Sequence, residues 1–143
     1  MTHLEAATKV ALLYAALMFL WALLLGTMKY VQTERSPEHR AHAYTDIAHR
    51  AALLYSFALL LVAVFVHLSW WRPWINLAAA SAMALYFASA VAGYTWHGWR
   101  RDTENQFSPP TTGLRRFMAS LIAVEIGAGL VLTAGFVEGQ FDH

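Results

Sequence analysis

Three polar residues, His42, Asp46 and His49, follow one another at spacings of four and three. On an α-helix these spacings place all three side chains on one face, one above another. Imidazole and carboxylate groups together suit zinc, manganese or non-haem iron, and histidines can also ligate haem iron. The face therefore predicts a metal- or haem-binding site. A structural interpretation stays open, because Asp46 could instead complement a helix N-terminus or pair with Arg50.

A second polar group follows an apolar stretch later in the chain, where His97 is succeeded by a loop containing an acid and an amide, Asp102 and Asn105. If both groups meet at one membrane face, a third histidine joins the first two. The predicted metal ligands are then His42, Asp46, His49 and His97. For a haem that carries electrons, the two axial ligands would be His97 and one of the other two histidines. His97 could also be an interfacial residue beside its tryptophan neighbours.

Four apolar stretches must position these groups, at roughly residues 10–28, 47–68, 75–95 and 117–137. Each is long enough to cross a hydrocarbon core of about 30 Å. The chain of 143 residues is 58% hydrophobic and only 13% charged, which is more apolar surface than a small soluble domain can bury. No stretch alternates with a period of two, so helices must satisfy the backbone in lipid. The sequence predicts an all-α integral membrane four-helix bundle, forming a single domain over residues 1–143.

Basic residues are divided unevenly between the two predicted membrane faces. Two of them, Lys9 and Arg72, lie on one side, and eight lie in or beside the other two loops: Lys29, Arg35, Arg40, Arg50, Arg100, Arg101, Arg115 and Arg116. Positive charge favours the cytoplasmic side, so both termini should lie outside a bacterial-type inner membrane, with the histidine site facing the cytoplasm. A net charge of +1 gives no argument for nucleic acid, and the absence of cysteine excludes disulfides and thiolate sites.

Two local patterns predict how the helices begin and pack. Ser36, Pro37 and Glu38 suit an N-cap, a first helical position and an acidic first turn, which predicts a helical lead-in over residues 37–45. Small residues at four-residue spacing favour close helix contacts and a homo-oligomer. They are Ala80, Ala84, Ala88 and Ala92 in the third stretch, and Ala119, Ala123 and Gly127 in the fourth.

One carboxylic acid, Glu125, lies near the middle of the fourth stretch, between Val124 and Ile126. An unpaired carboxylate at that depth is costly, so Glu125 should be neutral or paired inside the bundle. It could form a structural hydrogen bond with a buried Tyr, Ser or Thr. Alternatively, it could relay protons or contact a substrate.

Two short motifs carry a family resemblance: Arg40-Ala41-His42 before the second stretch, and Asn105-Gln106-Phe107 after the third. Together with chain length and helix number, they resemble the small four-helix membrane isomerases typified by styrene oxide isomerase, and more distantly hydroxylaminobenzene mutase. In those proteins a comparable Ala-His opens helix 2, and an apolar residue, here Ile47, follows five positions later.

The resemblance implies a haem b between the subunits of a homotrimer, with His42 as its axial ligand. Asn105 would contact a small hydrophobic substrate, and Tyr94 or Tyr86 would be the family's helix-3 tyrosine; Asp46 is a further candidate catalytic group. The implied reaction is a redox-neutral rearrangement in which ferric haem acts as a Lewis acid on a substrate oxygen.

The chain departs from this family in helix 2, where Ala48-His49 stands in place of the family's Asn-Gly. A histidine there could supply a second axial ligand, which would close the iron to substrate and favour electron transfer. The alternatives are thus a bis-histidine haem protein, a non-haem metal protein, and a non-catalytic membrane subunit whose histidines lie at the interface.

Overall fold

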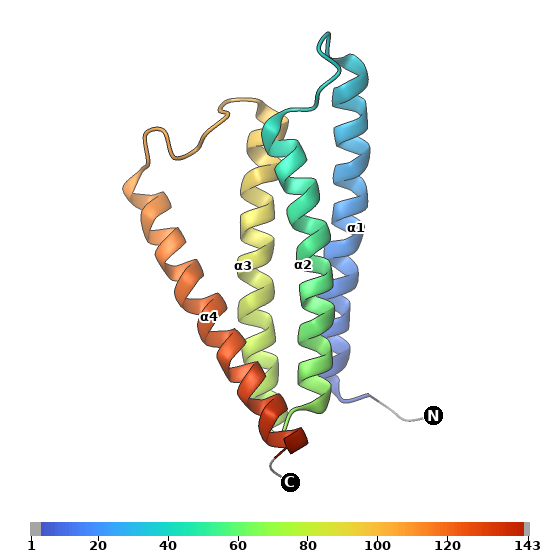
Figure 1. Cartoon of the computed structure of the whole chain (residues 1–143), viewed down its shortest axis with the longest axis vertical. Helices are drawn as coiled ribbons and strands as arrows, with labels where there is room; N and C mark the ends of the chain where they lie inside the picture. The colour runs from blue at the N-terminus through green and yellow to red at the C-terminus, as the bar shows by residue number, and fades with distance from the viewer. Residues whose placement is uncertain (1–3, 142–143) are drawn as a thin grey trace.

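The computed structural model describes residues 4–141 and contains four α-helices in that range. They are α1 (Ala6–Arg35), α2 (Ala43–Leu68), α3 (Pro73–Arg100) and α4 (Thr112–Phe141), and all run along the long axis of the molecule (Figure 1). The predicted all-α, four-helix architecture is confirmed, and each helix is long and apolar enough to cross a membrane. The predicted domain also included residues 1–3 and 142–143, which lie outside the described range.

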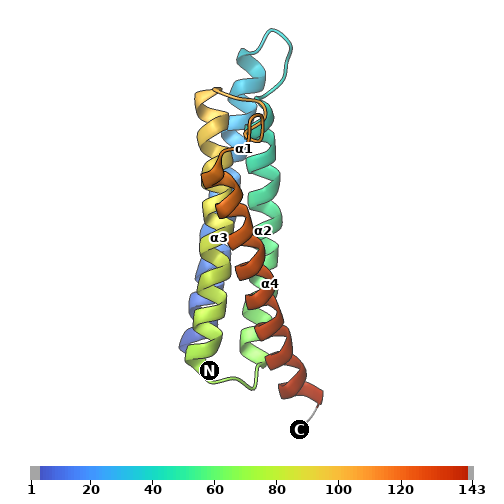
Figure 2. The same ribbon diagram turned by 90° about the vertical axis from the view of Figure 1, so that its left-hand side faces the viewer.

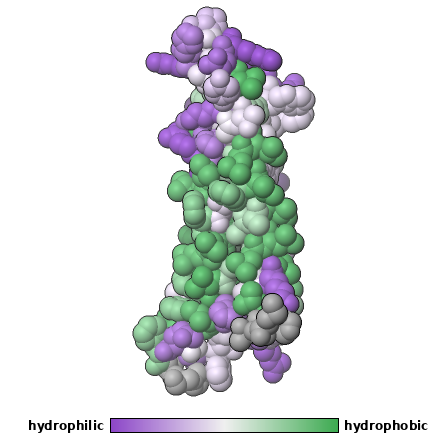
Figure 3. All heavy atoms as spheres, turned by 90° about the vertical axis from the view of Figure 1, so that its right-hand side faces the viewer, coloured by the Kyte–Doolittle hydropathy of each residue, from purple (hydrophilic) through white to green (hydrophobic). Residues whose placement is uncertain are grey.

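The two longer connections, residues 36–42 and 101–111, lie at the same end of the bundle (Figure 1). We call this end the basic end, because the eight basic residues predicted to share one face lie in or beside these connections. The opposite end carries the α2–α3 turn, the start of α1 and the end of α4. A wide apolar band separates the polar surfaces of the two ends (Figure 3), as a bundle in lipid requires.

Helices α1, α2 and α3 pack closely because small side chains line their contacts. Nearly fully buried alanines include Ala11, Ala22, Ala48, Ala52 and Ala80. A close approach brings Gly98 of α3 against Thr45 of α2, where a Cβ on the glycine would lie only 2.7 Å from the Thr45 nitrogen. The absence of a side chain at Gly98 therefore lets the end of α3 meet the start of α2.

Helix α4 separates from α3 as it approaches the basic end, and it crosses the other helices obliquely (Figures 1 and 2). Its far end is fixed to the α2–α3 turn: the indole Nε1 of Trp71 donates to the Val131 carbonyl at 2.8 Å, and the Trp70 amide donates to the Gly135 carbonyl at 2.9 Å. Within the described chain, the fully buried residues of α4 are Ala128, Leu132 and Gly135. The half of α4 near the basic end is therefore only loosely packed against its neighbours.

One prediction about local structure is wrong. Residues 36–42 form turns instead of a helical lead-in, and α2 begins at Ala43 with His42 as its N-cap. The Ser36 hydroxyl accepts a hydrogen bond from the Glu38 amide, two residues later. This local bond belongs to a turn and does not cap a helix. In α4, Ala119 and Ala123 are exposed because the helix leans outwards, whereas the α3 ladder does lie in the core through Ala80 and Ala84.

Candidate functional site

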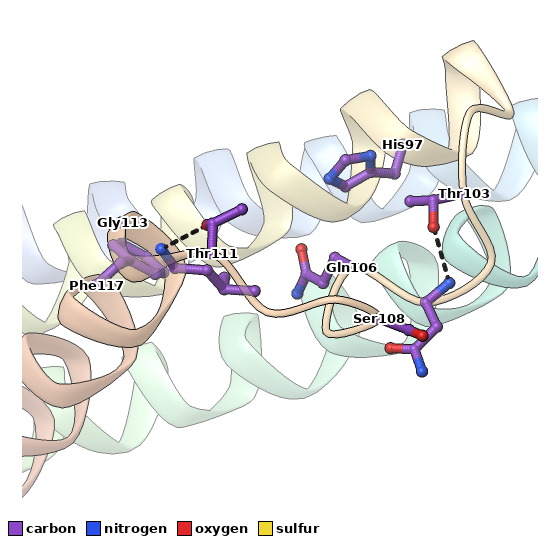
Figure 4. Close-up of a pocket in the computed structure, with 9 residues that line it drawn as sticks. His97, Thr103, Gln106, Ser108, Thr111, Gly113 and Phe117 are labelled. Atoms are coloured by element: carbon purple, nitrogen blue, oxygen red, sulfur yellow. Dashed lines mark hydrogen bonds between the residues drawn. The ribbon is translucent and has the colours of Figure 1, made fainter.

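A cavity of about 520 Å³ lies at the basic end, between the end of α3, the 101–111 connection and the start of α4 (Figure 4). This volume is in the range of small-molecule sites. One part of the wall is polar and another is apolar, as binding of a small amphipathic molecule requires. The lining residues used below are His97, Asn105, Gln106, Leu114 and Phe117.

His97 extends its ring over this cavity from the last turn of α3 (Figure 4). Its Nδ1 lies 2.8 Å from Oδ1 of Asp102, and the Arg100 side chain lies near the other carboxylate oxygen, with Nε 3.8 Å away. The hydrogen bond from His97 holds the pKa of the Asp102 carboxyl below its usual value. An ionised carboxylate can only accept, so Nδ1 carries the proton, and in the neutral imidazole Nε2 then keeps its lone pair. A carboxylate bound to Nδ1 is the arrangement that orients metal-ligating and catalytic imidazoles.

The loop that closes the cavity is held by the start of α2. The Tyr44 hydroxyl accepts a hydrogen bond from the Gln106 amide at 2.8 Å, and the Tyr44 ring lies 5.3 Å from that of His97. Asn105 uses its side-chain oxygen to accept from the Phe107 amide at 3.0 Å. Its side-chain nitrogen remains available as a donor. The predicted substrate contact Asn105 therefore lies in the same cavity wall as His97.

His42 plays a structural part. Its Nδ1 accepts a hydrogen bond from the Tyr44 amide at 3.2 Å and so caps α2. Its own amide donates to Oε1 of Gln32, whose Nε2 donates to the Gly98 carbonyl. In a neutral ring whose Nδ1 accepts, the proton sits on Nε2, which then has no lone pair for iron. Ligation by His42 would require the ring to give up its helix cap.

Asp46 and His49 both find partners on α1. Asp46 forms ion pairs with Lys29 of α1 at 2.6 Å and with Arg50 at 2.7 Å, the second of which was the structural alternative. The ring of His49 lies against Gly26 of α1, and its Nδ1 donates to the Ala22 carbonyl at 2.9 Å. The bond leaves a lone pair on Nε2 of His49, although this ring lies outside the residues that line the cavity.

The predicted four-residue metal site is therefore not assembled. No group of three or more histidine, aspartate or glutamate side chains within residues 4–141 is placed to hold a metal ion. The His42 and His97 rings also both contact Tyr44, at 6.2 and 5.3 Å between centroids. The aromatic ring of Tyr44 thus occupies the region where these two histidines could otherwise have shared a haem within one chain.

The two candidate helix-3 tyrosines lie beside the cavity in different ways. Tyr94 stacks on Tyr44 at 6.0 Å and lines a smaller crevice between α3 and α4, whereas Tyr86 stacks on Phe117 at 5.9 Å. Gln32 was not singled out from the sequence, although it joins the ends of α1, α2 and α3. The sequence offers one signal for the role of Gln32, which is an amide side chain in the last turns of an apolar helix.

Comparison of the chain with protein-family models, curated proteins and solved structures finds no match.

Proposed function

We propose that the chain is a multi-pass protein of a bacterial-type inner membrane, with its basic end in the cytoplasm. Its four long apolar helices support the membrane assignment, and the positive charges gathered at one end support the orientation. We further propose an isomerase-like enzyme whose small hydrophobic substrate binds in the cavity at the basic end. The observation that carries this proposal is the His97–Asp102 pair at a cavity with an apolar wall.

Different residues of the cavity would contact different parts of such a substrate. Leu114 and Phe117 offer apolar surface to its hydrocarbon part, which can arrive from the lipid between the loosely packed α3 and α4. The side-chain nitrogen of Asn105 can donate a hydrogen bond to a substrate oxygen and favour negative charge that develops there. Asp102 keeps the His97 ring in one orientation and one tautomer.

The resemblance to styrene oxide isomerase brings haem b into the proposal. Haem iron receives four nitrogens from the porphyrin and needs only one or two from the protein, so a single histidine suffices where a zinc or manganese site would need three ligands. Among the three candidates, His97 is the one that joins an available Nε2 to the cavity. His97 would therefore hold the haem, in preference to His42. When bound, the haem supplies a Lewis acid for a substrate oxygen.

A metal-free acid–base enzyme is the second candidate function, and the His97–Asp102 bond favours it too. An imidazole whose Nδ1–H is fixed by a carboxylate can take a proton at Nε2 from one substrate atom and return it to another. Because the proton is returned to the same substrate, nothing is added or lost, and the reaction is again an isomerisation. Bis-histidine electron transfer within one chain is less favoured, because Tyr44 lies against both His42 and His97.

The homotrimer stays part of the proposal through the resemblance. The exposed side of α4, with Ala119 and Ala123, offers small residues against which a second copy could pack closely.

The decisive experiment is an absorption spectrum of the detergent-purified protein, oxidised and dithionite-reduced, with metal analysis of the same sample. We expect a Soret band that His97→Ala removes, while His42→Ala and the remote control His67→Ala retain it. Loss in His42→Ala with retention in His97→Ala would contradict the assignment of the ligand. A colourless, metal-free protein would leave the acid–base enzyme. Conversion of an aryl epoxide to its aldehyde is the corresponding activity assay, and in either case it should be lost in His97→Ala.

A further inference from the structure

Glu125 lies on the inward side of α4, well away from the cavity described above. It follows Leu121 by one helical turn, and Leu121 is the deepest α4 residue that lines the crevice between α3 and α4. Its Oε1 is buried and, among the described residues, has no hydrogen-bond partner. A buried oxygen without a partner is costly in an apolar environment. A ligand that paired with this oxygen would therefore stabilise the carboxyl.

Aromatic side chains from two other helices lie near the carboxyl. Tyr55 of α2 and Tyr94 of α3 both lie close enough to Glu125 to interact with its charge, and they are the titratable groups that face it from those helices. The Tyr55 ring is stacked on Phe87 at 4.1 Å with the planes 4° apart. The site therefore combines one carboxyl with at least two aromatic side chains that carry hydroxyls.

Within residues 4–141, Glu125 forms no ion pair with a basic side chain. The ion pairs of Asp46 and Asp102 both lie at the basic end. The nearest basic residue along α4, Arg116, precedes Glu125 by more than two helical turns. A charge-balanced state of Glu125 thus requires either a proton or a cation from outside the chain.

The crevice that reaches Leu121, one helical turn before Glu125, has a volume of about 170 Å³ and is mostly apolar. Tyr94 contributes to its wall, and Gly93 leaves it wide, since a Cβ there would meet nothing within 4 Å. Aromatic rings beside a carboxylate are the chemistry that recognises an ammonium group with an apolar substituent. The small volume favours a cation with a single ring or a short alkyl chain.

We propose that Glu125, Tyr55 and Tyr94 form a second binding site, which takes a small hydrophobic ammonium cation in exchange for a proton. The empty site holds Glu125 as a neutral carboxylic acid. When the cation binds, the O–H bond breaks, the proton leaves to water, and the carboxylate pairs with the cation. The site is neutral in both states, which avoids the cost of a net charge within lipid. The crevice shares Leu114 and Phe117 with the cavity, but the second site does not rest on the proposed enzyme, because His97 takes no part in it.

Binding of benzyltrimethylammonium to the detergent-purified full chain tests this site. Isothermal titration in buffers of different ionisation enthalpy gives both the affinity and the number of protons released. We expect saturable binding that strengthens as the pH rises, with release of close to one proton per cation. Neopentylbenzene, which has the same shape without the charge, should release none.

Variants locate the site. Glu125→Gln keeps the shape of the side chain but cannot ionise, and should weaken binding by about tenfold or more, the loss of a desolvated cation–carboxylate contact. Glu34→Gln, an exposed acid at the end of α1, should bind as the wild type does, and so should His97→Ala. The proposal is overturned if the wild type does not bind the cation, if binding releases no proton, or if Glu125→Gln binds equally well. The pH dependence of the wild type needs no variant to fold.

Discussion

The Nδ1 atom of His97 lies 2.8 Å from Oδ1 of Asp102, across five residues that leave α3 and enter the connection to α4. This bond fixes the direction of the imidazole and ties the loop to the helix that carries it. Arg101, between them, adopts the left-handed conformation with φ 54°, which reverses the chain so that the carboxylate can reach back. The local course of the backbone after α3 is thus what places a carboxylate behind the candidate functional histidine.

Replacing this carboxylate should weaken the site without removing it. Asp102→Asn keeps the side-chain shape but can no longer hold the imidazole as a charged acceptor. Loss of such a supporting carboxylate costs about 10- to 100-fold in metal affinity or activity. We expect a loss of this size in haem affinity, or in aryl epoxide turnover if the protein is metal-free. Glu104→Gln, two residues further along the same loop, is the control and should change neither quantity.

The same bond predicts a dependence on pH. The pKa of Asp102 lies below its ordinary value near 3.8, mainly because of the hydrogen bond from His97; desolvation is the next largest effect and acts against it, and the charges of His97 and Arg100 lower the pKa further. A lowered pKa in the folded state adds stability above pH 3.8, and this stability is lost as the pH falls through the lower, folded value. Carboxyl ¹³C NMR of labelled aspartate should show the pKa of Asp102 returning towards 3.8 in His97→Ala. An unchanged Asp102 titration would contradict the bond.

The contact between α2 and α3 should be sensitive to a single methyl group at Gly98. An added Cβ would collide with the backbone of Thr45, which cannot move aside as a flexible side chain could. We expect Gly98→Ala to cost about 1–3 kcal/mol of stability, the usual penalty for overpacking, and to disturb the cavity next to it. Thermal unfolding in detergent measures the change. Gly127→Ala is the matched control, because its Cβ would meet nothing within 4 Å, and it should leave the midpoint unchanged or slightly raised.

The anchor of α4 can be tested at Trp71. Trp71→Phe keeps an aromatic ring but removes the indole N–H that donates to the Val131 carbonyl. We expect a loss of about 1 kcal/mol, the usual net value of one hydrogen bond, seen as a lower unfolding midpoint. Faster proteolysis within the 101–111 connection should accompany it, since α4 is held mainly at its other end. Trp74→Phe, at a largely exposed position, should show neither effect.

Much of the architecture could be read from the sequence because composition and length suffice to specify it. Four apolar stretches of about 20 residues leave helices as the structure that satisfies the backbone in lipid, and four helices are what the structure contains. The meeting of the two basic connections at one end follows from alternating helix direction. The helix boundaries were less accurate, because polar turns extend each helix beyond its apolar stretch.

The candidate site shows the opposite case. The spacing of His42, Asp46 and His49 predicted one shared helical face, but it could not say which partners each would find. Asp46 forms an ion pair with Lys29, and Nδ1 of His49 donates a hydrogen bond to the Ala22 carbonyl. Both partners belong to α1, far away in the sequence, so a periodicity within one helix carries no information about them.

The sequence by itself thus determined that the chain forms four membrane-length helices and that His42, His49 and His97 lie towards the basic end, because these properties depend on local composition. Only the tertiary structure decided which imidazole keeps a free nitrogen beside a cavity. That choice depends on hydrogen bonds: Nδ1 of His42 is used as a helix cap, whereas Nδ1 of His97 donates to Asp102 and leaves Nε2 available. The outward lean of α4, which opens the cavity, likewise arises from contacts between distant segments, at Trp71 and Gly135.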